Sequence, residues 1–161
     1  MQISTKFVQR RYDRIAPLYQ AMDRMIDDSQ RTELLSAAHG DVLEVGVGTG
    51  ANIPFYPLGA TVIGIDLSSR MLSYAKRRAR EARAQVRLLQ MDVQHLSFPP
   101  NTFDTVVSSC VFCTVPDPIQ GLSEIRRVLK PDGVLLMLEH MQSEHRLIAW
   151  ALNAINPLSV A

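Results

Sequence analysis

The stretch DVLEVGVGTGA, residues 41–51, places an apolar run directly before three closely spaced glycines. Residues 42–45 are mainly bulky or β-branched, which suits a strand buried on both faces of a parallel sheet. The glycines let the following loop turn tightly and approach a ligand, because no Cβ stands in the way. We expect a helix to begin soon after, with its free N–H groups directed at the ligand. The stretch therefore predicts a strand, loop and helix that hold a small anionic or polar cofactor.

The glycine spacing fits two kinds of cofactor site. Gly46, Gly48 and Ala51 satisfy the relaxed G-x-G-x-x-[GA] pattern of dinucleotide-binding proteins, which is weak evidence by itself. The fuller pattern, E-x-G-x-G-x-G from Glu44 to Gly50, resembles the first motif of class I S-adenosylmethionine-dependent methyltransferases. In that family the glycine loop lies under the amino-acid end of the cofactor. A nucleotide-dependent dehydrogenase and a glycine turn without a ligand are the alternatives.

Length and composition are those of an ordinary globular chain. The 161 residues predict one domain with a single core, and 47% of them are apolar and 20% charged. The net charge of +1 argues against a general nucleic-acid binder. Two cysteines are too few for a disulfide framework, which favours a cytoplasmic location. The sequence shows no signal-peptide pattern, and it contains no apolar run long enough to span a bilayer.

Residues 3–26 have the spacing of an amphipathic helix, with Pro17 as a break and a basic first half. We expect a cap helix packed over the sheet; it could also close over the cofactor or contact a membrane surface. Residues 11–19, RYDRIAPLY, resemble the Y-D-x-x-A-x-x-Y element of methyltransferases that act on lipids and quinones. This resemblance implies that Tyr12 and Tyr19 lie near the cofactor.

The next two expected strands are residues 61–66, which end on the acidic Asp66, and residues 85–91, which the acidic Asp92 follows. Because neighbouring parallel strands end at the same edge of a sheet, we expect Asp66 beside the glycine loop. Its carboxylate can accept both hydroxyl protons of a ribose there. Helix capping explains Asp66 less well, because Ser68 already offers a capping oxygen. The family resemblance implies that Asp92 reads the adenine amino group, with a simple turn residue as the alternative.

Residues 103–115 predict a fourth strand and its exit, so that the two cysteines emerge at the ligand edge. Cys110 and Cys113 form a lone C-x-x-C. A zinc site would need two more ligands, and no second cysteine pair exists. A thioredoxin-type dithiol sits at a helix N-terminus, whereas this pair follows a strand. We therefore expect the cysteines to pack or to line the pocket wall.

Residues 110–140 resemble a subgroup that contains bacterial phospholipid N-methyltransferases and animal small-molecule thiol methyltransferases. Residues 119–129 predict its crossover helix, residues 130–133 a turn and residues 134–139 a fifth strand. The loop before the fourth strand is enforced by the FPPN sequence at residues 98–101.

Together these elements predict an α/β fold, a Rossmann-like doubly wound parallel sheet of order 3-2-1-4-5. We expect one domain over residues 1–161, with cap helices at 1–38, a cofactor-binding core at 41–140, and a C-terminal helix and tail at 141–161. The family normally adds a sixth and a seventh strand. Here we expect them to be absent, or the sequence to be a fragment. The exposed edge of the fifth strand would then pair with a second copy, forming a homodimer, or be covered by the C-terminal helix.

These interpretations give three sets of candidate site residues, for the cofactor, for the acceptor and for catalysis. The candidate cofactor-binding residues are Tyr12, Tyr19, Glu44, Gly46, Gly48, Gly50, Asn52, Asp66, Leu67, Met71, Asp92, Val93 and Ser109. The candidate acceptor pocket contains Cys110, Cys113 and His140, and no metal site is expected. His140 is the candidate catalytic residue, because it follows the fifth strand and can take or orient the acceptor's proton.

The predicted activity is methyl transfer from S-adenosylmethionine, which leaves S-adenosylhomocysteine, to the amine of a phospholipid. The basic residues in 3–26 and 69–84 suit an anionic membrane surface, although a solvated face is the default explanation. A small thiol or a quinone-type acceptor is the first alternative, and a non-catalytic cofactor-binding module is the second. We expect no nucleic-acid partner, and a cytoplasmic location that is peripheral at the inner membrane face.

Overall fold

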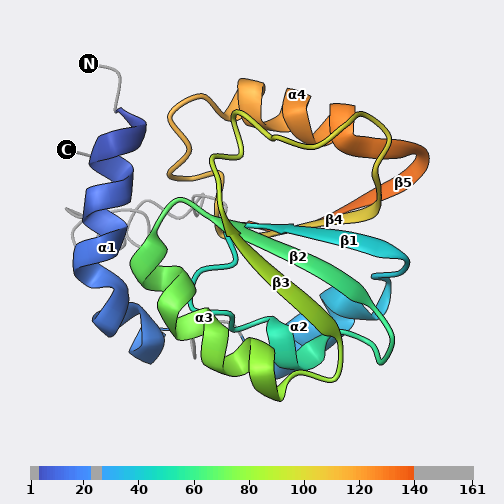
Figure 1. Cartoon of the computed structure of the whole chain (residues 1–161), viewed down its shortest axis with the longest axis horizontal. Helices are drawn as coiled ribbons and strands as arrows, with labels where there is room; N and C mark the ends of the chain where they lie inside the picture. Colours follow the sequence, from blue (N-terminus) through green and yellow to red (C-terminus); the bar gives the residue numbers. More distant parts are fainter. Residues whose placement is uncertain (1–3, 23–26, 140–161) are drawn as a thin grey trace, which may run out of the picture.

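The computed structural model describes residues 4–22 and 27–139 of the chain. Within them, five parallel strands form one sheet in the predicted order, β3-β2-β1-β4-β5, with helices on both of its faces (Figure 1). The strands are β1 (Asp41–Val45), β2 (Thr61–Asp66), β3 (Gln85–Gln90), β4 (Phe103–Ser109) and β5 (Leu129–Leu138). The helices are α1 (Thr5–Met22), α2 (Asp28–Ser36), α3 (Ser69–Glu81) and α4 (Pro118–Val128), with a short 3-10 helix, η2 (Ile53–Phe55). The predicted C-terminal helix lies outside the described residues.

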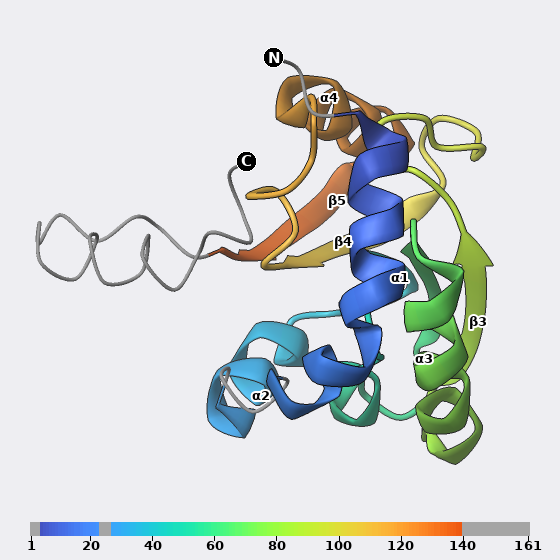
Figure 2. The same cartoon turned by 90° about the vertical axis from the view of Figure 1, so that its left-hand side faces the viewer.

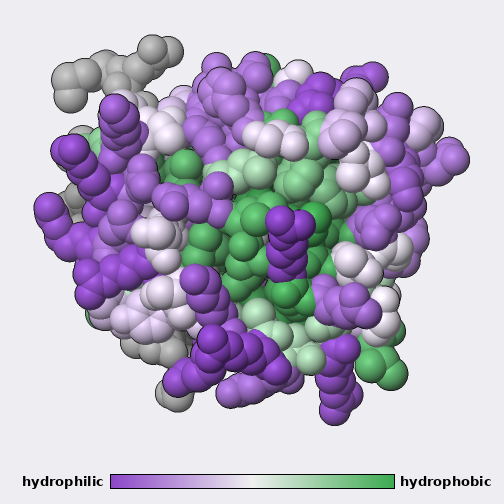
Figure 3. All heavy atoms as spheres, viewed as in Figure 1, coloured by the Kyte–Doolittle hydropathy of each residue, from purple (hydrophilic) through white to green (hydrophobic). Residues whose placement is uncertain are grey.

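Strand β1 is the centre of the sheet, as its apolar sequence predicts. It pairs with β2 on one side and with β4 on the other, so Leu43 lies between Ile63 and Val106. Successive β1 side chains point to opposite faces and join two different core clusters. One cluster contains α4, and the clusters on the other face contain α2 and α3. On the face seen in Figure 1, apolar side chains gather over the strands between α3 and α4 (Figure 3).

Helix α1 crosses the end of the sheet in front of the strands (Figure 2). The predicted break at Pro17 is wrong, because α1 continues through the proline to Met22. A proline removes a single N–H bond, here the one to the carbonyl of Asp13. The helix is held on the core by Val8 and Ala16, which are both buried, and this packing outweighs the local penalty. Among the described residues, no helix has the length and apolar character needed to cross a membrane.

The segment after the glycine loop also differs from the prediction. Only the three-residue η2 lies between β1 and β2, where we expected a full helix. Pro54 is the second residue of η2, and Pro57 follows the helix without an N–H to donate to a preceding helical turn. The N–H groups at this edge of the sheet are therefore those of the glycine loop and of the start of α3.

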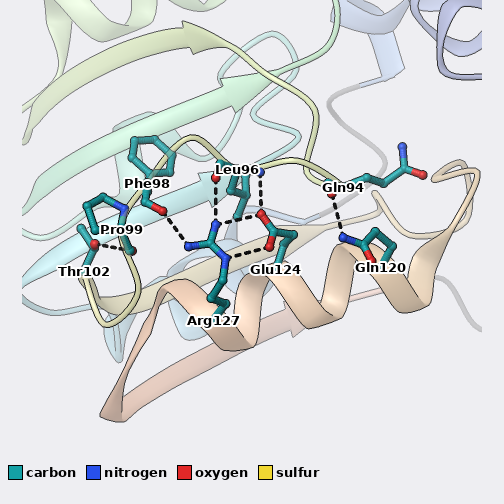
Figure 4. A network of polar contacts seen from close by, with 8 residues as sticks. All are labelled: Gln94, Leu96, Phe98, Pro99, Thr102, Gln120, Glu124 and Arg127. Carbon is teal, nitrogen blue, oxygen red and sulfur yellow. Dashed lines mark hydrogen bonds and ion pairs between the residues drawn. The ribbon is translucent and has the colours of Figure 1, made fainter.

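The loop between β3 and β4 is fixed to α4 by hydrogen bonds with two α4 residues, Glu124 and Arg127, which also form an ion pair with each other (Figure 4). Arg127 donates to both carboxylate oxygens of Glu124 at 2.7 and 2.8 Å. The same guanidinium donates to the carbonyls of Phe98 and Leu96, and Glu124 accepts from the Leu96 N–H. Side chains of α4 thus provide hydrogen-bond partners for the backbone of the proline-rich loop, which holds this loop in place although it forms no helix.

Strand β5 begins earlier than predicted. Leu129 already pairs with Phe103, and regular pairing resumes at Val134 opposite Thr105. The predicted turn at residues 130–133 is therefore an irregular, bulged part of the strand.

Candidate functional site

A cavity of about 270 Å³ lies at the carboxyl ends of the strands, under α1. Most of the predicted site residues line it: Tyr12, Tyr19, Glu44, Gly46, Gly48, Asn52, Asp66, Leu67, Met71, Asp92, Val93, Ser109, Cys110 and Cys113. Gly50 does not line the cavity, and His140 lies outside the described residues. The structure therefore brings residues from five separate segments of the sequence together around one space.

The glycine loop forms one wall of this cavity through Gly48. Gly48 has a φ of +55°, and the nearest atom to a Cβ added there would be the Gly46 carbonyl oxygen at 3.9 Å. A Cβ at Gly50 would instead meet Ile53 at 2.7 Å and Ala75 at 3.1 Å. The missing side chain of Gly48 thus leaves open space, whereas that of Gly50 permits close packing against α3.

Glu44 is the centre of a buried polar network beneath the loop. Its two carboxylate oxygens accept hydrogen bonds from Asn52 Nδ2 at 2.8 Å and from the Tyr56 hydroxyl at 3.0 Å. Asn52 also donates to Ser109 Oγ at 3.0 Å and accepts from Arg31 Nη1 at 2.6 Å. Burial raises the pKa of Glu44 to about 7, although these hydrogen bonds and the nearby Arg31 favour the ionised form.

Arg31 and Tyr56 were not among the residues predicted from the sequence. Arg31 is on α2, is only 5% exposed and lines the cavity, and Tyr56 follows η2. Both residues contact the network from outside the glycine motif, and nothing in their local sequence identifies them as site residues. The burial of Arg31 in this short helix is recognisable only when the fold places its side chain against Asn52.

Asp66 lies directly beside the glycine loop, as the strand topology predicted. Its Oδ2 accepts a hydrogen bond from the Gly48 N–H at 2.9 Å, and its Oδ1 accepts from the Ser68 N–H at 2.8 Å. Ser68, and not Asp66, caps α3, because its hydroxyl oxygen accepts a hydrogen bond from the Met71 N–H. Burial raises the pKa of Asp66 above its ordinary value, and the two N–H donors favour its ionised form. Its role toward a ribose stays a prediction.

Asp92 is oriented by Gln94, which sequence reasoning missed. The Gln94 side chain donates to both Asp92 carboxylate oxygens at 3.0 Å and to Thr5 of α1 at 3.2 Å. The Gln94 side-chain oxygen accepts from the N–H of Asp117, the N-cap residue of α4. One buried glutamine therefore connects the acid at the end of β3 to both helices that flank the cavity.

Helix α1 explains the Y-D-x-x-A-x-x-Y element residue by residue. Tyr12 and Tyr19 line the cavity with their rings 5.6 Å apart in an edge-to-face arrangement. Asp13 accepts from the Ser68 hydroxyl at 2.6 Å and fixes α1 to the start of α3. Ala16 is fully buried, which lets the helix approach the core closely. Phe7 lies on the same helix and is 48% exposed, so it is not part of this buried face.

The loop after β4 completes the cavity wall. Glu139 accepts from the Ser108 hydroxyl at 2.9 Å and from the Val111 N–H at 3.1 Å, and Cys110 has a φ of +56°. Thr114 accepts a hydrogen bond from the Tyr12 hydroxyl at 3.3 Å, which joins the loop to α1. Burial, and then the charge of Glu139, raises the pKa of the Cys113 thiol, so this cysteine is not an activated nucleophile.

The described part of the chain contains no group of His, Cys, Asp and Glu side chains that could hold a metal ion. The cavity is instead a cleft with a few convergent polar groups, the usual form of a small-molecule site.

Comparisons with known proteins place the chain among methyltransferases. Residues 43–137 match the family model of the methyltransferase domain. A phosphatidylethanolamine N-methyltransferase from Cereibacter sphaeroides is 39% identical over 140 residues, covering 83% of this chain and 68% of that protein. A thiol S-methyltransferase from Homo sapiens is 36% identical over 128 residues, covering 73% of this chain and 49% of that protein. The chain thus spans only about half the length of this second relative.

Among solved structures, an S-adenosylmethionine-dependent methyltransferase from Thermotoga maritima superposes with a TM-score of 0.72. The two sequences are 22% identical, and the match covers 93% of this chain and 69% of that one. At this identity the likeness supports the fold alone.

The sheet order, the glycine loop and the acids at the ends of β1, β2 and β3 define a class I methyltransferase. The chain belongs to the family of S-adenosylmethionine-dependent methyltransferases that carry this methyltransferase domain. Its cofactor is S-adenosylmethionine, and the residues present fit that group. Gly48 leaves space where a side chain would otherwise stand, and carboxylates are available on both sides of the loop.

Proposed function

We propose that this methyltransferase acts on the amine of a phospholipid headgroup. The observation that carries the proposal is the charge of the cavity. Among the described residues that line it, three carry carboxylates, Glu44, Asp66 and Asp92, and one carries a guanidinium, Arg31. Arg31 is the one cation among the described residues that line the cavity, so the cavity gives little stabilisation to the thiolate that a thiol acceptor must become, which favours an amine.

The two tyrosines of α1 support a cationic acceptor as well. Tyr12 and Tyr19 are partly buried, and burial raises the pKa of both hydroxyls, so the rings stay neutral. The electron-rich face of a tyrosine attracts ammonium groups, most strongly where water is excluded. Both tyrosines line the same cavity as Cys110 and Cys113, the residues predicted to form the acceptor pocket.

The outer surface of α1 supports a lipid source for that amine. Lys6, Arg10 and Arg14 are exposed on the helix, together with the apolar Phe7 and Leu18, which are 48% and 58% exposed. A surface that combines cations with exposed apolar side chains suits the interface of an anionic membrane. The C. sphaeroides relative, which is named for phosphatidylethanolamine, is consistent with this choice.

In this reaction S-adenosylmethionine supplies an electrophilic methyl group, so the protein needs to form no covalent intermediate and contributes mainly by orienting the reactants. Gly48 and Asp66 orient the cofactor at the strand ends, and Gln94 holds Asp92 in place. The tyrosines and the loop after β4 exclude water and align the acceptor. His140, outside the described residues, remains the predicted proton acceptor.

The proposal is tested by offering three acceptors under the same conditions: phosphatidylethanolamine in vesicles that contain an anionic lipid, an apolar thiol, and a demethylated quinol. We expect transfer of radiolabelled methyl to the phospholipid, and less transfer when the anionic lipid is omitted. Turnover of the thiol or the quinol alone would replace the proposal with the corresponding alternative. The predicted homodimer through β5 stays a prediction, which sedimentation of the active protein would test.

A further inference from the structure

We infer that Gln94 is a positioning residue that couples cofactor binding in the cavity to the docking of helix α1 over it. Gln94 follows β3 and is 5% exposed, yet it is not among the residues that line the cavity. It therefore acts on a bound cofactor through its neighbours. The inference rests on S-adenosylmethionine as the cofactor and is independent of which acceptor the enzyme uses.

The orientation of the Gln94 side-chain amide is fixed at the start of α4. Its oxygen accepts a hydrogen bond from the N–H of Asp117 at 2.9 Å. The Gln94 backbone carbonyl accepts from the side chain of Gln120 on α4 at 3.2 Å (Figure 4). A reversed amide would turn its oxygen against the carboxylate of Asp92 and its NH₂ group against the Asp117 N–H. The NH₂ group therefore faces Asp92 and α1.

The two hydrogens of this NH₂ group serve different segments of the chain. Nε2 lies 3.0 Å from each carboxylate oxygen of Asp92 and 3.2 Å from Thr5 Oγ1 of α1. One hydrogen thus faces the carboxylate, and the other faces the threonine hydroxyl. Asp92 lines the cavity, whereas Thr5 does not. Gln94 therefore joins an acid of the cavity wall to a helix residue that lies outside that wall.

Docking of the first turns of α1 also shapes the cavity itself. Val8, three residues after Thr5, is buried and lines the cavity, as Tyr12 does one turn later. The contact between Thr5 and Gln94 thus holds the part of α1 that covers the cofactor.

The shared amide makes the two contacts support each other. A free glutamine side chain loses rotamer freedom when its amide is held in one orientation. Docked α1 meets part of this cost through Thr5, so Asp92 is already oriented when a cofactor with hydroxyl and amino donors arrives. The cofactor in turn restrains Asp92 and Gln94, which favours docked α1 by the same factor, because coupling between two sites is reciprocal.

Calorimetric titration with S-adenosylhomocysteine tests this coupling without any acceptor. Thr5→Val removes the hydroxyl, keeps the shape of the side chain and alters no cavity-lining residue. We expect it to weaken binding about 2- to 10-fold, the range for one neutral hydrogen bond. Thr32→Val removes an exposed threonine hydroxyl of α2 outside the cavity, and as the matched control it should leave the affinity unchanged. An unchanged affinity in Thr5→Val would overturn the inference.

A double-mutant cycle then tests the route through Gln94. Gln94→Met, which keeps the length of the side chain but removes its amide, should weaken binding about tenfold, because Asp92 loses the donor that orients it. Adding Thr5→Val to Gln94→Met should cause no further loss, since the partner of the hydroxyl is already gone. Additive losses would show that Thr5 acts by another route and would overturn the inference.

Gln94→Glu separates this positioning role from a purely structural one. Glutamate keeps an oxygen for the N–H of Asp117, but it places a second carboxylate against Asp92. At pH 8 we therefore expect Gln94→Glu to bind S-adenosylhomocysteine no better than Gln94→Met does. If Gln94 only held the start of α4, glutamate would restore the affinity of the unaltered protein, and that result would contradict the inference.

Discussion

Replacing Glu44 with glutamine should make the protein more stable at pH 8 while weakening its cofactor binding. Glu44 is 2% exposed, and burial raises its pKa from 4.5 to about 7. Glutamine fits the same space: its oxygen can accept from Asn52, and its amide can donate to the Tyr56 hydroxyl, which can rotate to accept. The substitution therefore removes the buried charge, and its cost is the hydrogen bond that the Tyr56 hydroxyl donates to Glu44, so the gain in stability that follows from the raised pKa is an upper limit.

The size of the effect follows from the raised pKa. Between pH 4.5 and about 7 the native protein holds a proton on Glu44 that the unfolded chain has lost, so stability falls as pH rises through this window. At 1.36 kcal/mol for each pKa unit, the complete loss above pH 7 is about 3 kcal/mol. Glutamine does not titrate, so we expect Glu44→Gln to gain up to about 3 kcal/mol at pH 8 and almost nothing at pH 4.

Urea unfolding of both proteins at several pH values between 4 and 8 measures this difference. The free energy gained by the variant should grow with pH and level off above about 7, with an unchanged dependence on urea concentration. Glu81→Gln, at an exposed site on α3, is the matched control and should show no such pH dependence. A variant that is equally or less stable at pH 8 would refute the reasoning. In the same samples, S-adenosylhomocysteine should bind at least about tenfold more weakly, because the cofactor cavity has lost one of the charges that line it.

Three further predictions concern the walls of the cavity. Gly48→Ala should weaken S-adenosylhomocysteine binding, with a modest loss of stability of about 1 kcal/mol because of the positive φ at this position. Gly50→Ala should instead lower stability more than affinity, because its Cβ would meet Ile53 and Ala75. Calorimetric titration measures the affinities and thermal unfolding measures the stabilities. Asp13→Asn should loosen α1 from Ser68 and speed cofactor release in stopped-flow measurements; unchanged release would show that this contact does not hold the helix closed. Arg127→Met should lower the thermal midpoint by several degrees yet leave cofactor affinity intact, and a selective loss of affinity would contradict its structural role.

The features predictable from the sequence are those that depend on a single strand and its end. Glu44 and Asp66 could be assigned to the same edge of the sheet because a buried parallel strand is recognisable by its apolar run, and because neighbouring parallel strands end at one edge. The glycine motif then located the cavity between them. The resemblance of the α1 segment placed Tyr12 and Tyr19 at the same edge, and the structure puts both on the cavity wall.

The features that could not be predicted depend on contacts between distant segments. Arg31, Gln94 and Glu139 each act through partners more than twenty residues away, and their local sequences resemble ordinary surface helix or loop. Of the wrong backbone predictions, the break at Pro17 has the same origin. Pro17 was expected to end a helix on local grounds, but packing of α1 on the core overrides it, and the prolines near η2 shorten a helix that the glycine motif alone suggested.

The most direct test of this account is the identity of the methylated product. The protein would be incubated with S-adenosylmethionine that carries a deuterated methyl group and with vesicles of phosphatidylethanolamine and an anionic lipid, and the extracted lipids would be examined by mass spectrometry. We predict a mass increase of one deuterated methyl group on the phosphatidylethanolamine headgroup, lost in Gly48→Val, which would fill the cavity beside the loop. Label that appears only on an added thiol or quinol, or a headgroup that stays unlabelled while the cofactor is bound, would contradict the account.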